Sequence, residues 1–85
     1  MAGPVGEMST RVRLTFPEAL VREPVVAQLV RRFDVEPNIR RASVEAHEGW
    51  IICELDGEPA AVEGAVAWLE EIGVSVDRLG DVLEG

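Results

Sequence analysis

The residues best suited to binding chemistry in this 85-residue chain lie together in the segment 38–41, which reads Asn-Ile-Arg-Arg. The Asn38 side chain both donates and accepts hydrogen bonds, so it could orient a ligand-binding loop. Asn also commonly caps a turn by bonding to nearby backbone, and that alternative role stays open. Ile39 could line an apolar pocket for a ligand or a second subunit. We therefore predict Asn38, Ile39 and Arg40 as ligand-binding residues.

The other reactive side chains do not indicate catalysis. Cys53 is the only cysteine, which excludes an internal disulfide and a cluster ligated by cysteines within the chain. It lies in an apolar run without an adjacent base, where a thiol usually behaves as a small hydrophobe. His47 has no second metal-ligating residue at a suitable spacing. We predict no catalytic residue, no metal and no cofactor, and hence a protein that is not an enzyme.

The charge balance limits the classes of partner. The chain has eight arginines, no lysine and sixteen acidic residues, which gives a formal net charge of −8. This balance does not favour nucleic acid, because phosphate binding needs clustered positive charge. No stretch approaches the ~20 apolar residues of a membrane helix, and the N-terminus lacks a secretory signal pattern. We predict one cytoplasmic domain without membrane insertion.

The spacing of the apolar residues predicts both strands and helices along the chain. Residues 11–16 alternate apolar and polar side chains, which predicts a half-buried strand. Pro24 suits the first turn of a helix, and Pro59 suits the first turn of a second one. Gly73 fits the left-handed cap of the second helix, and residues 74–79 predict the last strand. The stripe that faces the core on the first helix is predicted to consist of Val26, Leu29, Val30 and Phe33.

Residues 41–46 and 50–55 predict two further strands, joined by a tight turn at 48–49. Ile39 is out of phase with the side chains of the first of these strands that point inward. This break predicts either a β-bulge near Arg40 or a loop in which Ile39 points at something of its own. The inward set itself is predicted to be Ala42, Val44 and Ala46.

The order of these elements leaves one economical fold. Short loops and right-handed crossovers favour an α+β, ferredoxin-like βαββαβ sandwich, with two helices on one face of a four-stranded antiparallel sheet. The first and third strands are then central. We assign the domain to residues 10–80, with an N-terminal arm at 1–9 and a C-terminal tail at 81–85.

The face of this sheet that the helices leave open predicts a homodimer. Trp50 and Ile52 lie on it, in a strand whose second face is unusually apolar for contact with water. A monomer of this size seldom leaves such a patch open, and two-fold pairs are its commonest use. We predict a dimer interface formed by Trp50, Ile52, Arg41 and Ser43. The alternative is that the N-terminal arm folds back over Trp50.

Placed in order, several short motifs resemble the NIL domain, an ACT-like module with a ferredoxin-like fold. The resemblance covers most of the chain, from residue 11 to residue 79. The third position of the name-giving Asn-Ile-Leu triplet is Arg40 here, and Asn-Ile-Arg-Arg-Ala is more similar to the ferredoxin-associated branch. The motifs that carry the resemblance are Asn38-Ile39, Gly49-Trp50, Leu55-Asp56-Gly57, Ala65, Trp68-Leu69 and Gly73-Val74.

This resemblance supplies a functional expectation that the fold alone would not. In methionine-type ABC transporter ATPases the module binds methionine at a dimer interface and slows transport. The resemblance therefore implies a non-catalytic sensing or regulatory domain that binds an amino acid, methionine-like, at a dimer interface. The alternative is an interaction module without a ligand, which docks on an iron–sulfur or sulfur-metabolism partner. The expected protein partner is accordingly a transporter or a ferredoxin-type protein.

Overall fold

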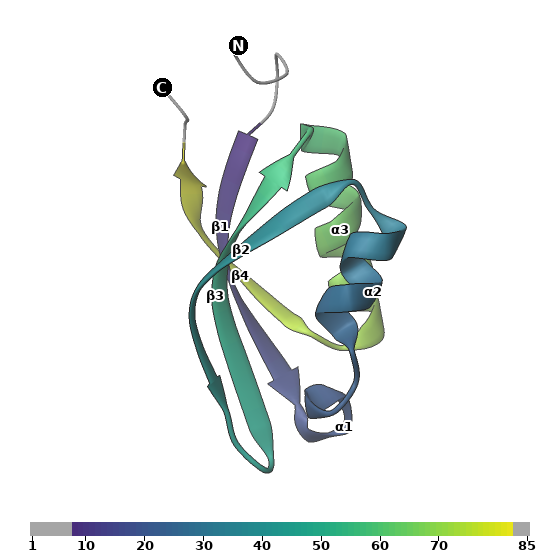
Figure 1. The fold of residues 1–85 in the computed structure, drawn as a ribbon, viewed down its shortest axis with the longest axis vertical. Helices are drawn as coiled ribbons and strands as arrows, with labels where there is room; N and C mark the ends of the chain where they lie inside the picture. The colour runs from purple at the N-terminus through teal and green to yellow at the C-terminus, as the bar shows by residue number, and fades with distance from the viewer. Residues whose placement is uncertain (1–7, 83–85) are drawn as a thin grey trace.

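A four-stranded sheet with its helices on one side organises the chain (Figure 1). The computed structural model describes residues 8–82. Its elements, in chain order, are β1 (Met8–Pro17), α1 (Glu18–Val21), α2 (Val25–Arg32), β2 (Val35–Val44), β3 (Glu48–Gly57), α3 (Pro59–Ile72) and β4 (Ser75–Val82).

The strand order is β2-β3-β1-β4, and all three neighbouring pairs are antiparallel. The first and third strands are therefore central, and the predicted ferredoxin-like α+β fold is confirmed. The first and last strands of the chain run past the predicted domain limits at residues 10 and 80, because β1 begins at Met8 and β4 ends at Val82. The rest of the predicted arm and tail lies outside the described residues.

The core lies between the sheet and the two longer helices. Val12 of β1 stands opposite Cys53 of β3, and both point toward the helices and are almost fully buried. Gly73 ends α3 in the left-handed conformation, with φ 107°, as the sequence predicted. The helices and the segments beside them contribute the remaining core residues, among them Val25, Leu29, Val35, Val62, Ala65, Val66, Leu69 and Val74.

The predicted stripe of the first helix was partly wrong. The side chains of α2 that face the core are Val25 and Leu29, one helical turn apart, while Val30 is 47% exposed. Pro24 is the N-cap rather than an internal residue, so the helix begins at Val25, which is also the first of its buried residues. Phe33, at the C-cap, is half-buried against Trp68. The one-turn helix α1 was not predicted.

The bulge near Arg40 is confirmed, and the loop alternative for Ile39 is wrong. The β2–β3 register shifts between Ile39 and Arg41, so that Ile39 stands opposite Cys53 and Ala42 stands opposite Ile51. All four side chains therefore share the helix-facing side of the sheet.

The inward set predicted for this strand was also partly wrong. Ala42 and Val44 have the predicted direction but are exposed, because β2 is an edge strand that the helices cover incompletely. Ala46 lies beyond the end of β2, in the connection to β3.

Candidate functional site

The open face of the sheet carries an ordered ladder of side chains along β3. Trp50, Ile52, Glu54 and Asp56 alternate with the core residues of this strand and point to the side without helices. The half of the ladder near the hairpin is apolar, and the other half is acidic. The flanking strands supply its neighbours on this face, which are Ser9, Arg11, Arg13 and Thr15 from β1 and Glu36, Asn38, Arg41 and Ser43 from β2.

Glu54 is the centre of the acidic half. Arg11 donates a hydrogen bond to its Oε2 at 2.7 Å, and Arg40 donates one to its Oε1 at 2.8 Å. These hydrogen bonds, from Arg11 and then Arg40, hold the pKa of Glu54 below its usual range. The Glu54 side chain is only 7% exposed, whereas the side chains of Arg11 and Arg40 are 45% and 60% exposed. The two guanidinium groups therefore cover the carboxylate and still reach the surface.

Asp56 forms the second polar cluster, two residues further along the same face. The Ser9 hydroxyl donates to its Oδ1 and the Asn38 amide donates to its Oδ2. Each carboxylate oxygen therefore accepts a hydrogen bond from one of the two strands that flank β3, which are β1 and β2. Ser9 is almost fully buried. Asn38 lies inside β2 and bonds across the sheet, so the predicted loop position and the turn-capping alternative are both wrong.

The three predicted ligand-binding residues do not share one surface. Asn38 and Arg40 both bond to carboxylates of the open face, on Asp56 and Glu54. Ile39 points to the helix side and is 54% exposed. Their assignment to a ligand stays a prediction, and only Asn38 and Arg40 can serve a site on the open face.

Sequence reasoning missed Ser9 and Asp56 as members of these clusters. Asp56 stands in the Leu55-Asp56-Gly57 motif, which is the signal that could have identified it. Ser9 carried no such signal in the sequence, because it was assigned to the N-terminal arm.

The four residues predicted for the dimer interface are neighbours on the open face. Ser43 stands opposite Trp50, and Arg41 stands opposite Ile52. Both apolar side chains are half-buried within one chain. The Arg13 guanidinium lies 5.0 Å from the centre of the Trp50 ring, in a cation–π contact that covers part of the indole. Their role in a dimer stays a prediction.

The remaining candidates for chemistry lie apart from these clusters. Burial, and then the charge of Glu54, raises the pKa of the Cys53 thiol to about 11, so this thiol stays protonated at neutral pH. His47 is exposed, with Nδ1 2.7 Å from Oε2 of Glu18 on α1. Within residues 8–82, no three His, Cys, Asp or Glu side chains are grouped so that they could hold a metal ion. None of the helices described is long and apolar enough to cross a membrane.

The open face thus brings together charged groups of both signs and apolar surface, which are the features that a zwitterionic ligand with an apolar part would need. Asp56, which is partly exposed, presents carboxylate oxygens suited to an ammonium group, and Arg11 and Arg40, which cover Glu54, present donors suited to a carboxylate. Trp50 and Ile52 provide apolar surface along the same strand.

Comparison with solved structures gives the class of domain. The fold resembles the C-terminal domain of an ABC transporter/ATP-binding protein from Enterococcus faecalis, with a TM-score of 0.73 and 23% sequence identity. The similarity covers 84% of this chain and 83% of that domain. At this identity it establishes the fold alone, which is that of a small α+β domain found in such a protein.

The sequence comparisons then give the family. Residues 10–78 match the NIL domain, and the chain belongs to this family. It is 35% identical over 65 residues to an uncharacterized protein of Synechocystis, covering 74% of this chain and 67% of that protein. It is 32% identical over 85 residues to the methionine import ATP-binding protein MetN of Escherichia coli K12, covering 95% of this chain. The chain spans 25% of the length of that transporter protein.

Proposed function

We propose that this chain is a non-catalytic regulatory domain that binds a methionine-like amino acid on the open face of its sheet, at a dimer interface. Membership of the NIL family supports a regulatory role, and several relatives are methionine import ATP-binding proteins. The observation that carries the proposal is that one sheet face combines the Asp56 carboxylate, the guanidinium groups of Arg11 and Arg40, and the half-buried side chains of Trp50 and Ile52.

The polar end of the ligand would meet the acidic half of the ladder. An α-ammonium group would donate to Asp56, taking up lone pairs that Ser9 and Asn38 leave available. An α-carboxylate would accept from Arg40, whose side chain is 60% exposed even while it bonds Glu54.

The apolar end of the ligand and the second subunit would both contact the apolar half of the ladder. Trp50 and Ile52 each leave apolar surface in water, and burying a large apolar side chain yields roughly 1.5–3 kcal/mol. Two copies related by a two-fold axis would bury both residues at once, with Arg41 and Ser43 at the border. A ligand held between the subunits would thereby couple its binding to dimerisation.

Chemical-shift mapping with methionine tests the site. In the intact chain, saturating methionine should shift amides of residues 38–41 and of residues 54–56. Asp56→Asn should weaken binding at least tenfold, because it removes the charge that attracts the ammonium group. Glu45→Gln is the matched control, because it removes the same charge from an exposed position outside both clusters. If no amide of 38–41 or 54–56 moves at saturation, the proposed site is wrong.

A second function, that of an interaction module without a ligand, is favoured by one specific observation. Arg11 and Arg40 already neutralise Glu54, and Asn38 and Ser9 already bond Asp56, so the network is satisfied within one chain. Such a domain would dock on a ferredoxin-type or sulfur-metabolism protein. A screen of the proteinogenic amino acids that gives no shift, combined with specific binding to such a partner, would decide for this function.

A further inference from the structure

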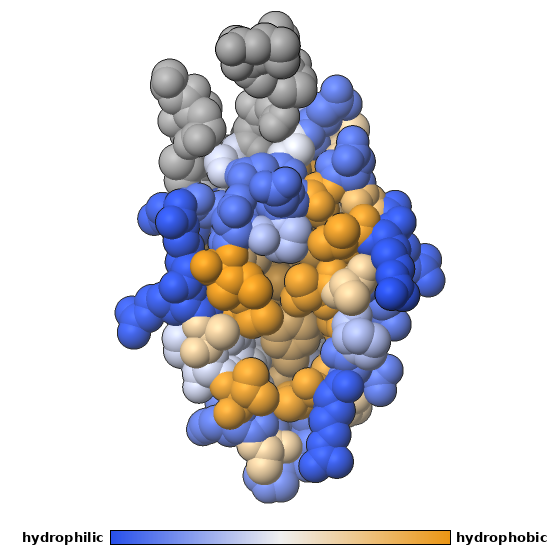
Figure 2. All heavy atoms as spheres, in the orientation of Figure 1, coloured by the Kyte–Doolittle hydropathy of each residue, from blue (hydrophilic) through white to orange (hydrophobic). Residues whose placement is uncertain are grey.

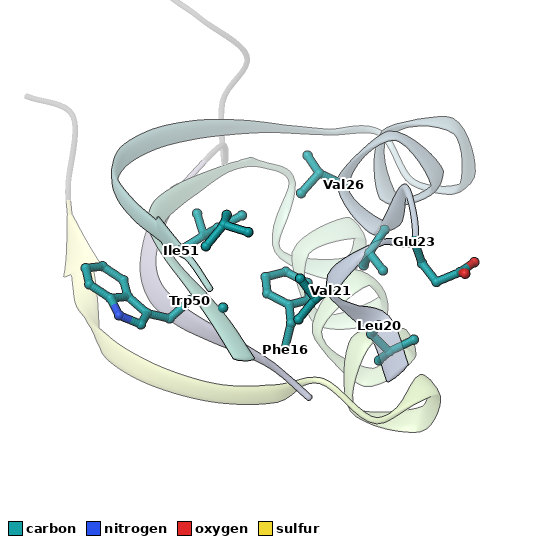
Figure 3. Close-up of a pocket in the computed structure, with 10 residues that line it drawn as sticks. Phe16, Leu20, Val21, Glu23, Val26, Trp50 and Ile51 are labelled. Carbon is teal, nitrogen blue, oxygen red and sulfur yellow. The ribbon is translucent and has the colours of Figure 1, made fainter. Parts of the chain in front are cut away.

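An apolar groove lies on the helix side of the sheet, away from the open face. It has a volume of about 100 Å³ and is formed where α1 and α2 face the hairpin end of β2 and β3. Phe16, Val21, Val26 and Ile51 surround its centre, while the Trp50 ring points away from it (Figure 3). Val44, on the edge strand, is part of its wall and is 73% exposed.

The groove continues along the outer edge of β2. This strand pairs with β3 on one side and with no strand of residues 8–82 on the other. Its helix-facing residues Ile39 and Val44 are both more than half exposed, so apolar surface runs along the edge. Apolar residues gather down the middle of the surface view, between polar borders (Figure 2).

The usable part of this edge lies next to the groove. Pro37 cannot donate a backbone hydrogen bond, and the bulge at Arg40 interrupts the ladder, so the first half of β2 is a poor template for another strand. Residues 41–44 have neither feature. An added strand there would send alternate side chains to the helix side, directly over the groove. The groove has a smaller volume than the ~150 Å³ of a cavity that holds benzene. A space of this size suits one aliphatic side chain.

The charge around the groove indicates what kind of segment fits. Glu23 is part of its rim, and the exposed residues Glu18, Glu45 and Glu48 lie on the segments that border it. The exposed Arg22 and Arg41 offset part of this charge, and His47 lies against Glu18, but the four acids still outnumber the two arginines. A second copy of this chain, with a net charge of −8, would bring the same acidic rim against itself, and facing like charges oppose association. A segment with arginine or lysine beside its apolar residues would complement the rim.

We propose that the edge of β2 and the adjacent groove bind an extended segment of a partner protein, which carries an apolar anchor flanked by basic residues. The segment adds to the sheet beside residues 41–44 and places its anchor between Val44 and Val26. This surface is separate from the open face, so it is available whether or not the proposed amino-acid site is occupied.

A synthetic peptide tests the proposal on the intact chain. The probe is the capped heptapeptide Arg-Thr-Leu-Thr-Val-Thr-Arg, whose pattern of basic, polar and apolar residues is the same in either strand direction. It should shift the amides of residues 21–26 and 41–44, and a control with glutamate in place of both arginines should not. Two further versions, N-methylated at odd or at even residues, should differ sharply, because only one set of amides faces β2 in a ladder. If both methylated versions bind like the parent peptide, strand addition is refuted.

Two single substitutions separate groove binding from simple charge attraction. Val44→Glu should weaken peptide binding at least tenfold, although it makes the chain more acidic. Leu79→Glu adds the same charge at a 50% exposed apolar residue of β4, the opposite edge strand, and should leave binding unchanged. Equal affinity of both variants would overturn the proposal. So would concentration-dependent shifts at residues 41–44 without peptide, which would indicate a second copy in the groove.

Discussion

Replacing Gly57 by alanine should destabilise the fold, although strand propensity alone predicts the opposite. Glycine inside a strand costs roughly 0.5–1 kcal/mol relative to alanine, and this is an upper bound for Gly57, the last residue of β3. A Cβ at Gly57, however, would lie 2.9 Å from the backbone oxygen of Asp34 and 3.3 Å from a methyl group of Val35. A backbone oxygen cannot rotate away as a side chain can, so β2 and β3 must separate locally. Such overpacking typically costs about 1–3 kcal/mol, which exceeds the gain in propensity.

The expected net loss of about 1 kcal/mol is measurable in a urea titration followed by tryptophan fluorescence. With a slope of about 1 kcal/mol/M, the midpoint should fall by roughly 1 M at an unchanged slope. Gly64→Ala is the matched control, because its Cβ would meet only the edge of the Phe33 ring, at 3.3 Å. That ring is half-buried and can shift, while the helix gains about 1 kcal/mol, so this variant should be at least as stable as the parent. If Gly57→Ala is also as stable as the parent, the close approach of β2 to Gly57 is wrong.

Three further predictions concern the open face and the core. The double variant Trp50→Glu with Ile52→Lys should keep its circular dichroism spectrum but sediment as a monomer, and a persistent dimer would place the interface elsewhere. Because folding lowers the pKa of Glu54, this residue stabilises the fold above the usual glutamate pKa, and the stabilisation is lost as pH falls through the folded-state pKa. Glu54→Gln should therefore make the free energy of unfolding fall less steeply at acid pH. An unchanged acid limb would contradict this reasoning. The Cys53 thiol should react with Ellman's reagent only as fast as the fold opens, since its pKa of about 11 and its burial withhold the thiolate; rapid modification of the native protein would show that the thiol is accessible.

Much of the fold could be predicted because local patterns and tertiary packing agree. The alternation in β1, the prolines at the starts of α2 and α3, and the glycine after α3 each have one dominant structural reason. Even the bulge was predictable, since Ile39 breaks a period of two. The helix α1 was not, because a single turn of Glu-Ala-Leu-Val has no periodicity to read.

The site was less predictable because its bonds join distant parts of the chain. The Ser9 hydroxyl reaches Asp56 across 47 residues, and Arg11 reaches Glu54 across 43. Only the register of three strands brings these partners together, and no local spacing encodes it. The exposure of Val44 has a similar cause, because it depends on how far the helices extend over an edge strand.

Sedimentation equilibrium with and without methionine tests the central claim most directly. If the amino acid binds at the interface of a homodimer, the unliganded chain dimerises and saturating methionine lowers the dimer dissociation constant, as linkage requires. Asn38→Ala should dimerise without this response, because its link to Asp56 is lost. A chain that sediments as a monomer at high micromolar concentration with and without methionine would contradict the account, and so would a dimer whose dissociation constant methionine leaves unchanged.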